Sequence, residues 1–187
     1  WKYYLSDGSV AESFEYGNEY IAFLVAEEIP VSDTMYIGTQ TNPEEMVYTW
    51  VDAATLASRC PGQHITFKLN ENISITSTQP AKFEVPVNVT LDLNGKTLDL
   101  SAIAHPIRFI PGSGGSSFEV VTSVAGGSVT AGSTSMFYPD VNYGTINIKM
   151  GSADTEDIAF TGKYLVYGST RFRSGATLNL DIVGGEH

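Results

Sequence analysis

Short runs of alternating apolar and polar residues occupy most of the chain beyond residue 62. Five of these runs share one pattern, in which apolar side chains alternate with Thr, Glu, Lys, Asp or Asn: Ile65–Leu69, Val89–Leu93, Phe118–Thr122, Ile146–Met150 and Leu178–Ile182. Their starts lie about 24 to 32 residues apart, which is within the range of solenoid repeats. Alternation with a period of two predicts strands with one face in a core. The recurrence predicts that one structural unit is stacked several times.

Each unit contains two further apolar runs, separated by turn residues such as Gly, Asn and Ser. The second runs are Ile73–Ile75, Thr97–Leu100, Ser128–Thr130 and Ile158–Phe160, and the third are Phe83–Val85, Ile107–Ile110, Met136–Tyr138 and Leu165–Tyr167. Three strands per coil, stacked at about 4.8 Å, predict an all-β fold. We therefore expect a parallel β-helix of four coils with a fifth begun.

One helix is expected between about Thr49 and Cys60, because Trp50, Val51, Ala54 and Ala57 share one side at helical spacing. Pro61 and Gly62 end it. The sequence Asn42-Pro43-Glu44-Glu45 also has the order of a helix start, so an earlier beginning remains open. We expect Trp50 and Val51 to cover the apolar end of the first coil.

The N-terminal segment differs in charge from the rest of the chain. Lys2 is its single basic residue, whereas its acidic residues are Asp7, Glu12, Glu15, Glu19, Glu27, Glu28 and Asp33. Asp7-Gly8 is a plausible hairpin turn, and residues 20–25 have the pattern of a buried strand. This predicts three parts: a small acidic β appendage or linker over 1–41, a capping helix within 42–62, and a parallel β-helix over 63–187.

The overall charge narrows the choice of partners. The chain has 187 residues, 42% of them hydrophobic and 17% charged, and a net charge of −11. A surface of that sign repels nucleic acids and anionic lipid headgroups, and the apolar runs are too short for membrane insertion. The single Cys60 and three histidines lack zinc-ligand spacing. We expect no metal and no cofactor.

The helix over residues 50–60, the run from Gly62 to Leu69 and the run from Val89 to Leu98 resemble the opening of right-handed β-helices of the pectate-lyase-like superfamily. The resemblance covers about residues 47–187 and implies a right-handed coil whose first turn the helix caps. Known members include polysaccharide lyases, glycoside hydrolases, phage tailspikes, adhesins and inert stalks. The resemblance therefore indicates a fold and leaves the function open.

The candidate functional residues are those expected to face outward from the coils. Lys68 with Asp92, Lys149 with Asp181, and Glu84 with Arg108 are expected to form charge pairs between coils that stabilise the fold without catalysing a reaction. No nucleophile, acid or base stands out as catalytic. Residues on the third sheet and its edges could contact a glycan: Tyr138, Asp140, Tyr143, Tyr164, Tyr167, Arg171 and Arg173.

We expect a non-catalytic shaft or adhesin segment, extracellular and located on a bacterial surface or a virion, that contacts a polysaccharide or cell-surface glycan. The alternative is a polysaccharide lyase or glycoside hydrolase acting on the outer face of the coils, which would need clustered carboxylates. The run Leu178–Ile182 opens a coil that the sequence leaves incomplete, with apolar residues at its end. Further chain or partner subunits, for example in a homotrimer, are expected to cover that end.

Overall fold

The computed structural model describes residues 3–5, 10–11, 20–21, 35–39, 47–168 and 175–184. The chain divides into two compact units, residues 1–31 and 32–187. In the first unit, β1 (Tyr3–Leu5) pairs antiparallel with β2 (Val10–Ala11) and β3 (Tyr20–Ile21). The predicted hairpin pairing is therefore present, whereas Asp7, Gly8 and residues 22–25 lie outside the described residues.

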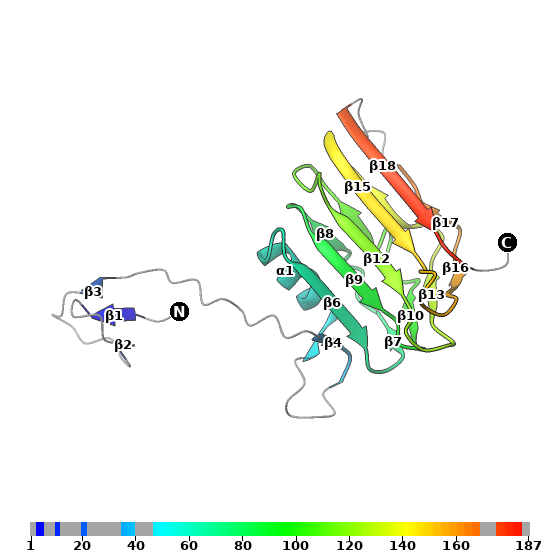
Figure 1. The fold of residues 1–187 in the computed structure, drawn as a ribbon, viewed down its shortest axis with the longest axis horizontal. Helices are drawn as coiled ribbons and strands as arrows, with labels where there is room; N and C mark the ends of the chain where they lie inside the picture. Colours follow the sequence, from blue (N-terminus) through cyan, green and yellow to red (C-terminus); the bar gives the residue numbers. More distant parts are fainter. Residues whose placement is uncertain are drawn as a thin grey trace. The chain divides into compact units, whose positions relative to one another are not determined.

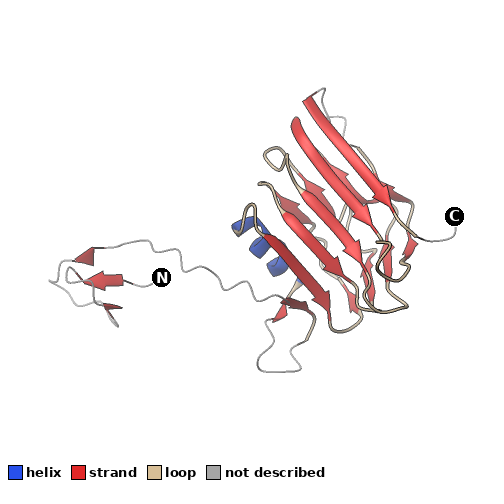
Figure 2. Ribbon diagram, in the orientation of Figure 1, coloured by secondary structure: helices blue, strands red, loops and turns tan. Residues whose placement is uncertain are grey.

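The second unit is a parallel β-solenoid with three strands per coil, as the sequence pattern predicts (Figures 1 and 2). Its first sheet has the order β18-β15-β12-β9-β6-β4-β5, the second β16-β13-β10-β7, and the third β17-β14-β11-β8. In chain order the strands are β4 (Met35–Ile37), β5 (Val47–Tyr48), β6 (His64–Leu69), β7 (Ile73–Ser74), β8 (Ala81–Phe83), β9 (Asn88–Asp92), β10 (Thr97–Leu100), β11 (Ile107–Phe109), β12 (Ser117–Val121), β13 (Ser128–Ala131), β14 (Ser135–Pro139), β15 (Tyr143–Met150), β16 (Ala159–Thr161), β17 (Tyr164–Val166) and β18 (Gly175–Ile182).

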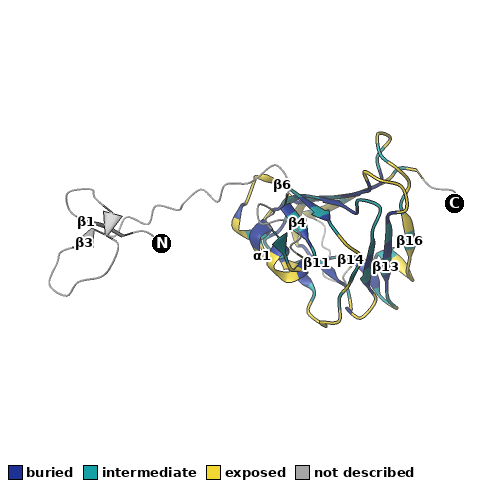
Figure 3. Cartoon of the chain, turned by 90° about the horizontal axis from the view of Figure 1, so that it is seen from below, coloured by how far each residue is buried: buried dark blue, intermediate teal, exposed yellow. Residues whose placement is uncertain are grey.

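Inward-facing residues of the three sheets form the core, and Figure 3 colours the buried residues dark blue. Phe118 lies at its centre, with ring centroids 6.0 Å from Phe83, 6.5 Å from Phe109 and 5.6 Å from Phe137. These four phenylalanines come from two of the three sheets and are each at most 3% exposed. Aromatic packing therefore ties the first sheet to the third.

The helix α1 (Trp50–Arg59) covers the first coil. The Thr49 hydroxyl caps it by accepting a hydrogen bond from the backbone N–H of Asp52 at 3.2 Å. The strand β5 directly precedes this cap, so the alternative start at Asn42 is wrong. Trp50 is buried as predicted, but Val51 is 43% exposed, because the buried stripe runs through Ala53, Leu56 and Ala57 instead.

A strand pair that the sequence pattern did not predict extends the first sheet beyond the first coil. Met35 of β4 pairs with Phe67, and β4 in turn pairs in parallel with β5. The compact unit accordingly begins at Ser32, so the solenoid includes residues that we expected in the 1–41 segment. Strand pairing here protects the edge of β6.

The opposite end of the stack carries exposed apolar side chains. Leu180 and Ile182 of β18 are 45% and 48% exposed, although they continue the rows of buried Ile148 and Met150. The described part of the chain places no strand on the outer edge of β18. The covering of this end by further chain or partner subunits stays a prediction.

In the first sheet, the register between coils agrees with the prediction at every junction except one. Val89 pairs with Ile65 and Phe118 with Val89, and Ile146 pairs with Leu178. Phe118, however, lies opposite Ile148 and not Ile146. This places Glu119 beside Lys149, whose ammonium lies 2.9 Å from the carboxylate. A shift of two residues keeps every side chain on its own face, so burial alone could not reveal it.

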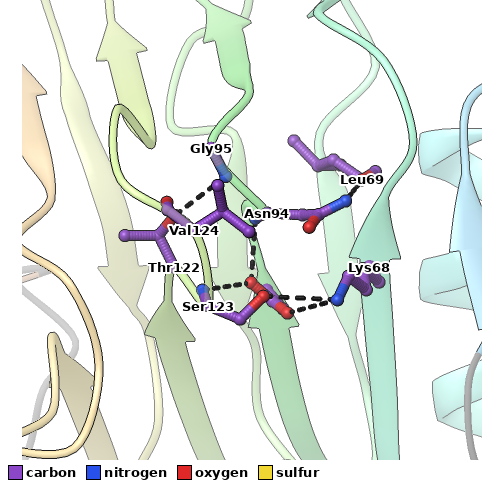
Figure 4. A network of polar contacts seen from close by, with 8 residues as sticks. Lys68, Leu69, Asn94, Gly95, Thr122, Ser123 and Val124 are labelled. Carbon is purple, nitrogen blue, oxygen red and sulfur yellow. Dashed lines mark hydrogen bonds and ion pairs between the residues drawn. The ribbon is translucent and has the colours of Figure 1, made fainter.

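Asp92 lies opposite Lys68 as predicted, with the ammonium 3.5 Å from the carboxylate, but the expectation that it faces solvent is wrong. It is only 7% exposed. The loop that carries Ser123, labelled in Figure 4, approaches this carboxylate from the next coil. The backbone N–H groups of Ser123 and Asn94 each donate to Asp92 Oδ1 at 2.8 Å. The carboxylate thereby joins three coils.

Asp92 is expected to make stability depend on pH. Burial by itself raises the pKa of Asp92, but the hydrogen bonds from Ser123 and Asn94 and the charge of Lys68 outweigh it, so the pKa lies below the ordinary value of 3.8. A depressed pKa contributes stability above pH 3.8 that is lost as the pH falls through the folded-state pKa. We expect Asp92→Asn to lower the free energy of unfolding by about 1–3 kcal/mol at pH 7.

Urea unfolding of both proteins between pH 7 and pH 2 measures this difference. It should be constant above pH 5 and should shrink below about pH 4. Glu156→Gln, which alters an exposed carboxylate, is the matched control and should change the free energy of unfolding by less than about 0.5 kcal/mol at pH 7. A difference that persists unchanged at pH 2 would contradict the assignment to the ionised carboxylate.

Candidate functional site

The outer face of the third sheet gathers most of the candidate residues. Arg108 pairs with Lys82 on one side and Tyr138 on the other. Phe137 pairs with Val166, and the N–H of Tyr167 donates to the Phe137 carbonyl at 3.1 Å, so Tyr167 continues the row beyond Tyr138. We call this row of Lys82, Arg108, Tyr138 and Tyr167 the outer row. It crosses four coils.

The rings of the outer row are stacked. Tyr138 and Tyr167 have centroids 6.5 Å apart and planes inclined by only 13°. Tyr164 lies beside them, with its centroid 6.0 Å from that of Tyr167. Tyr164 is 45% exposed and Tyr167 51% exposed. The sheet thus presents aromatic surface to solvent at a spacing set by its own backbone.

His105 is held against the same rings. Its ring centroid lies 4.3 Å from that of Tyr138, and its Nδ1 lies 2.9 Å from the hydroxyl of the buried Ser135. Its φ of 52° is left-handed, which costs energy for a residue with a side chain. The backbone N–H of His105 also donates to the Thr134 hydroxyl at 2.9 Å. These contacts fix the position of the imidazole.

The surroundings of this imidazole favour its neutral form. Burial, and then the nearby positive charge of Arg108, lower the pKa of His105 below its ordinary value of 6.5. A neutral ring offers one hydrogen-bond donor and one acceptor. His105 can therefore serve as a polar contact beside an aromatic surface.

Arg108 lies between Lys82 and Tyr138 in the outer row. Its guanidinium carbon lies 5.2 Å from the centre of the Tyr138 ring, a cation–π distance. Its Nε is buried and finds no hydrogen-bond partner in the described part of the chain. The predicted pair of Arg108 with Glu84 is wrong, because the strand register puts Lys82 opposite Arg108.

The structure brings three of the predicted residues together and places one other on a different sheet. Tyr138, Tyr164 and Tyr167 form one surface. Asp140 follows β14 and is only 7% exposed, while its N–H donates to the Phe109 carbonyl at 2.6 Å. Tyr143 is 61% exposed but begins β15 in the first sheet. Arg171 and Arg173 lie outside the described residues.

The alternation of apolar and polar residues in the sequence did not assign Lys82, His105 or Arg108 to this site. Alternation in Ile107-Arg108-Phe109 signals that Arg108 points outward, but its neighbours depend on the coil register. His105 gives no such signal, because it lies in the turn before β11. Only the bend at its left-handed backbone brings it to the tyrosines.

Three further findings concern the residues that the structure describes. No group of three or more His, Cys, Asp and Glu side chains is arranged to hold a metal ion there. No described helix has the length and hydropathy of a membrane span. Cys60 is buried at the end of α1.

No family model matches the chain, and neither the curated proteins nor the solved structures gave a match.

Proposed function

We propose that this chain is a non-catalytic binding segment whose solenoid displays the outer row to glycans. The observation that carries the proposal is the pair of nearly parallel rings, Tyr138 and Tyr167, on a rigid sheet. Sugar rings present C–H groups that pack on aromatic faces, while their hydroxyls need polar partners. His105 and the tyrosine hydroxyls can supply those partners.

The setting we propose is extracellular, on a bacterial surface or a virion, where a shaft or adhesin would meet glycans. Its basis is the resemblance of the helix and first coils to β-helices of the pectate-lyase-like superfamily, to which we propose this chain is related. The parallel stacking of coils supports a shaft, because each coil contacts only its neighbours and the structure extends in one direction.

We expect Tyr167→Ala to weaken glycan binding by about fivefold or more, because a lost aromatic stack costs roughly 1–3 kcal/mol in comparable ring contacts. A glycan array followed by titration calorimetry on the ligands it identifies measures this change. Tyr143→Ala is the matched control, since Tyr143 is also an exposed tyrosine but lies on the first sheet. Its effect should stay within twofold.

Equal losses from both substitutions, or no binding to any glycan, would contradict the proposal. The enzymatic alternative gives a different signature. A lyase or glycoside hydrolase would release new reducing ends from a polysaccharide over time, whereas a binding segment would leave the polymer intact. Reducing-end measurement on the polysaccharides that bind therefore separates the two.

A further inference from the structure

Two positive charges face each other across neighbouring coils of the third sheet. Lys82 of β8 pairs directly with Arg108 of β11, and Lys82 is exposed. Like charges directly opposite one another destabilise a sheet. The arrangement is unexpected in a chain of net charge −11, where acidic partners are abundant.

The first sheet shows the opposite arrangement. Among the described residues, the ion pairs between side chains are Lys68 with Asp92 and Lys149 with Glu119, both on that sheet. Lys82 and Arg108 have no such pair within the same part of the chain. When a fold pairs opposite charges elsewhere, an unfavourable pair of like charges is most often found at a functional site.

An acidic residue follows directly after β8. Glu84 follows Lys82 by two residues on the same face and is exposed, but neither cation forms an ion pair with it. Arg108 instead lies over Tyr138, with its Nε buried. A partly dehydrated guanidinium next to a free ammonium favours an anion from outside the chain.

Space for such a group exists beside Lys82. A groove of about 420 Å³ opens between α1 and β8 and is lined by Thr55, Ser58, Pro80, Lys82 and Glu84 among others. The outer row leads away from this groove to the tyrosines. Four strands at about 4.8 Å spacing give the row a length of roughly 14 Å.

The outer row is basic at one end and aromatic at the other. We therefore infer that the glycan carries an acidic sugar at one end of a stretch of neutral rings. Its carboxylate or sulfate lies between Lys82 and Arg108, and the following rings pack on Tyr138 and Tyr167. A polymer with an acid on every ring would fit less well, since the outer row is basic at one end only. This inference rests on the proposed glycan binding. It adds the chemical class of the ligand and the direction in which the ligand lies along the outer row.

The test uses the full chain on an array of oligosaccharides printed in matched pairs, with and without a terminal carboxylated or sulfated sugar. Carboxylated and sulfated members distinguish the two sources of the anion. We expect the acidic member of at least one pair to bind about tenfold more tightly than its neutral counterpart. This preference should weaken as salt is raised.

Substitutions then assign the preference to the two cations. Lys82→Gln and Arg108→Gln should each remove most of the acidic preference, measured for each variant as the ratio of its affinities for the acidic and the neutral member of a pair. Lys96→Gln, which alters a lysine outside the third sheet, should not change this ratio. Glu84→Gln removes a neighbouring negative charge and should not weaken the acidic ligand. Circular dichroism and thermal midpoints confirm that each variant is folded.

The outcomes separate this inference from the proposed function. Equal binding of acidic and neutral members, with Tyr167→Ala still weakening both, would overturn the acidic ligand and keep glycan binding. An acidic preference unaffected by Lys82→Gln and Arg108→Gln would likewise overturn it. Absence of binding to every glycan would overturn both.

Discussion

Replacing Trp50 with alanine is expected to lower the free energy of unfolding of the solenoid by about 3–5 kcal/mol. The indole is 6% exposed and lies over the first coil, where it lines a small cavity of about 20 Å³ together with Phe67, Phe83 and Leu91. Alanine would enlarge this cavity and remove the contacts of the indole with the coil. Because the core continues through all coils, the open end would expose apolar surface.

Urea unfolding followed by circular dichroism measures this effect. The matched control is Val51→Ala, which alters the next residue of α1 but a side chain that is 43% exposed. Its cost should stay below about 1 kcal/mol. Equal changes for the two variants would mean that Trp50 does not act as the cap of the coil.

A comparable loss is expected for Phe118→Ala, because Phe118 joins the first and third sheets. The substitution removes a side chain that is 3% exposed and that contacts Phe83, Phe109 and Phe137. Loss of a buried phenylalanine costs about 3–5 kcal/mol, and the aromatic contacts add to its upper range. For a unit of this size, the thermal midpoint should fall by about 6–20 °C.

The control for this substitution is Phe160→Ala. Phe160 belongs to β16 near the uncovered end of the stack and is only half-buried, so its replacement should cost clearly less. The comparison uses thermal and urea unfolding of both variants. If the two losses were equal, the core would not be centred on Phe118.

Much of the solenoid followed from the sequence because its period-two pattern is local. Alternation in Ile146-Asn-Ile-Lys-Met150 assigns each side chain to the core or to the surface without knowledge of the neighbouring strand. Repetition of that pattern predicted three strands per coil, and the structure has them. The burial of Trp50 was predictable for the same reason, since helical spacing placed it on the apolar stripe.

The candidate site was only half predictable. The tyrosines could be selected from the sequence because two of them occupy outward or edge positions of third strands. Their stacking, and their separation from Tyr143, depended on which coil and which sheet each strand joined. His105 entered the site through a turn with a left-handed backbone, which no periodic pattern reports.

The sequence by itself determined the repeated strands, their inward residues and the net negative charge, because these depend on residue type and local alternation. The tertiary structure alone decided which side chains oppose each other between coils. A strand can slide by two residues without exposing its core face, so packing of the bends chooses the register. That choice placed Lys149 beside Glu119, covered Asp92 with the next loop, and set Lys82 against Arg108.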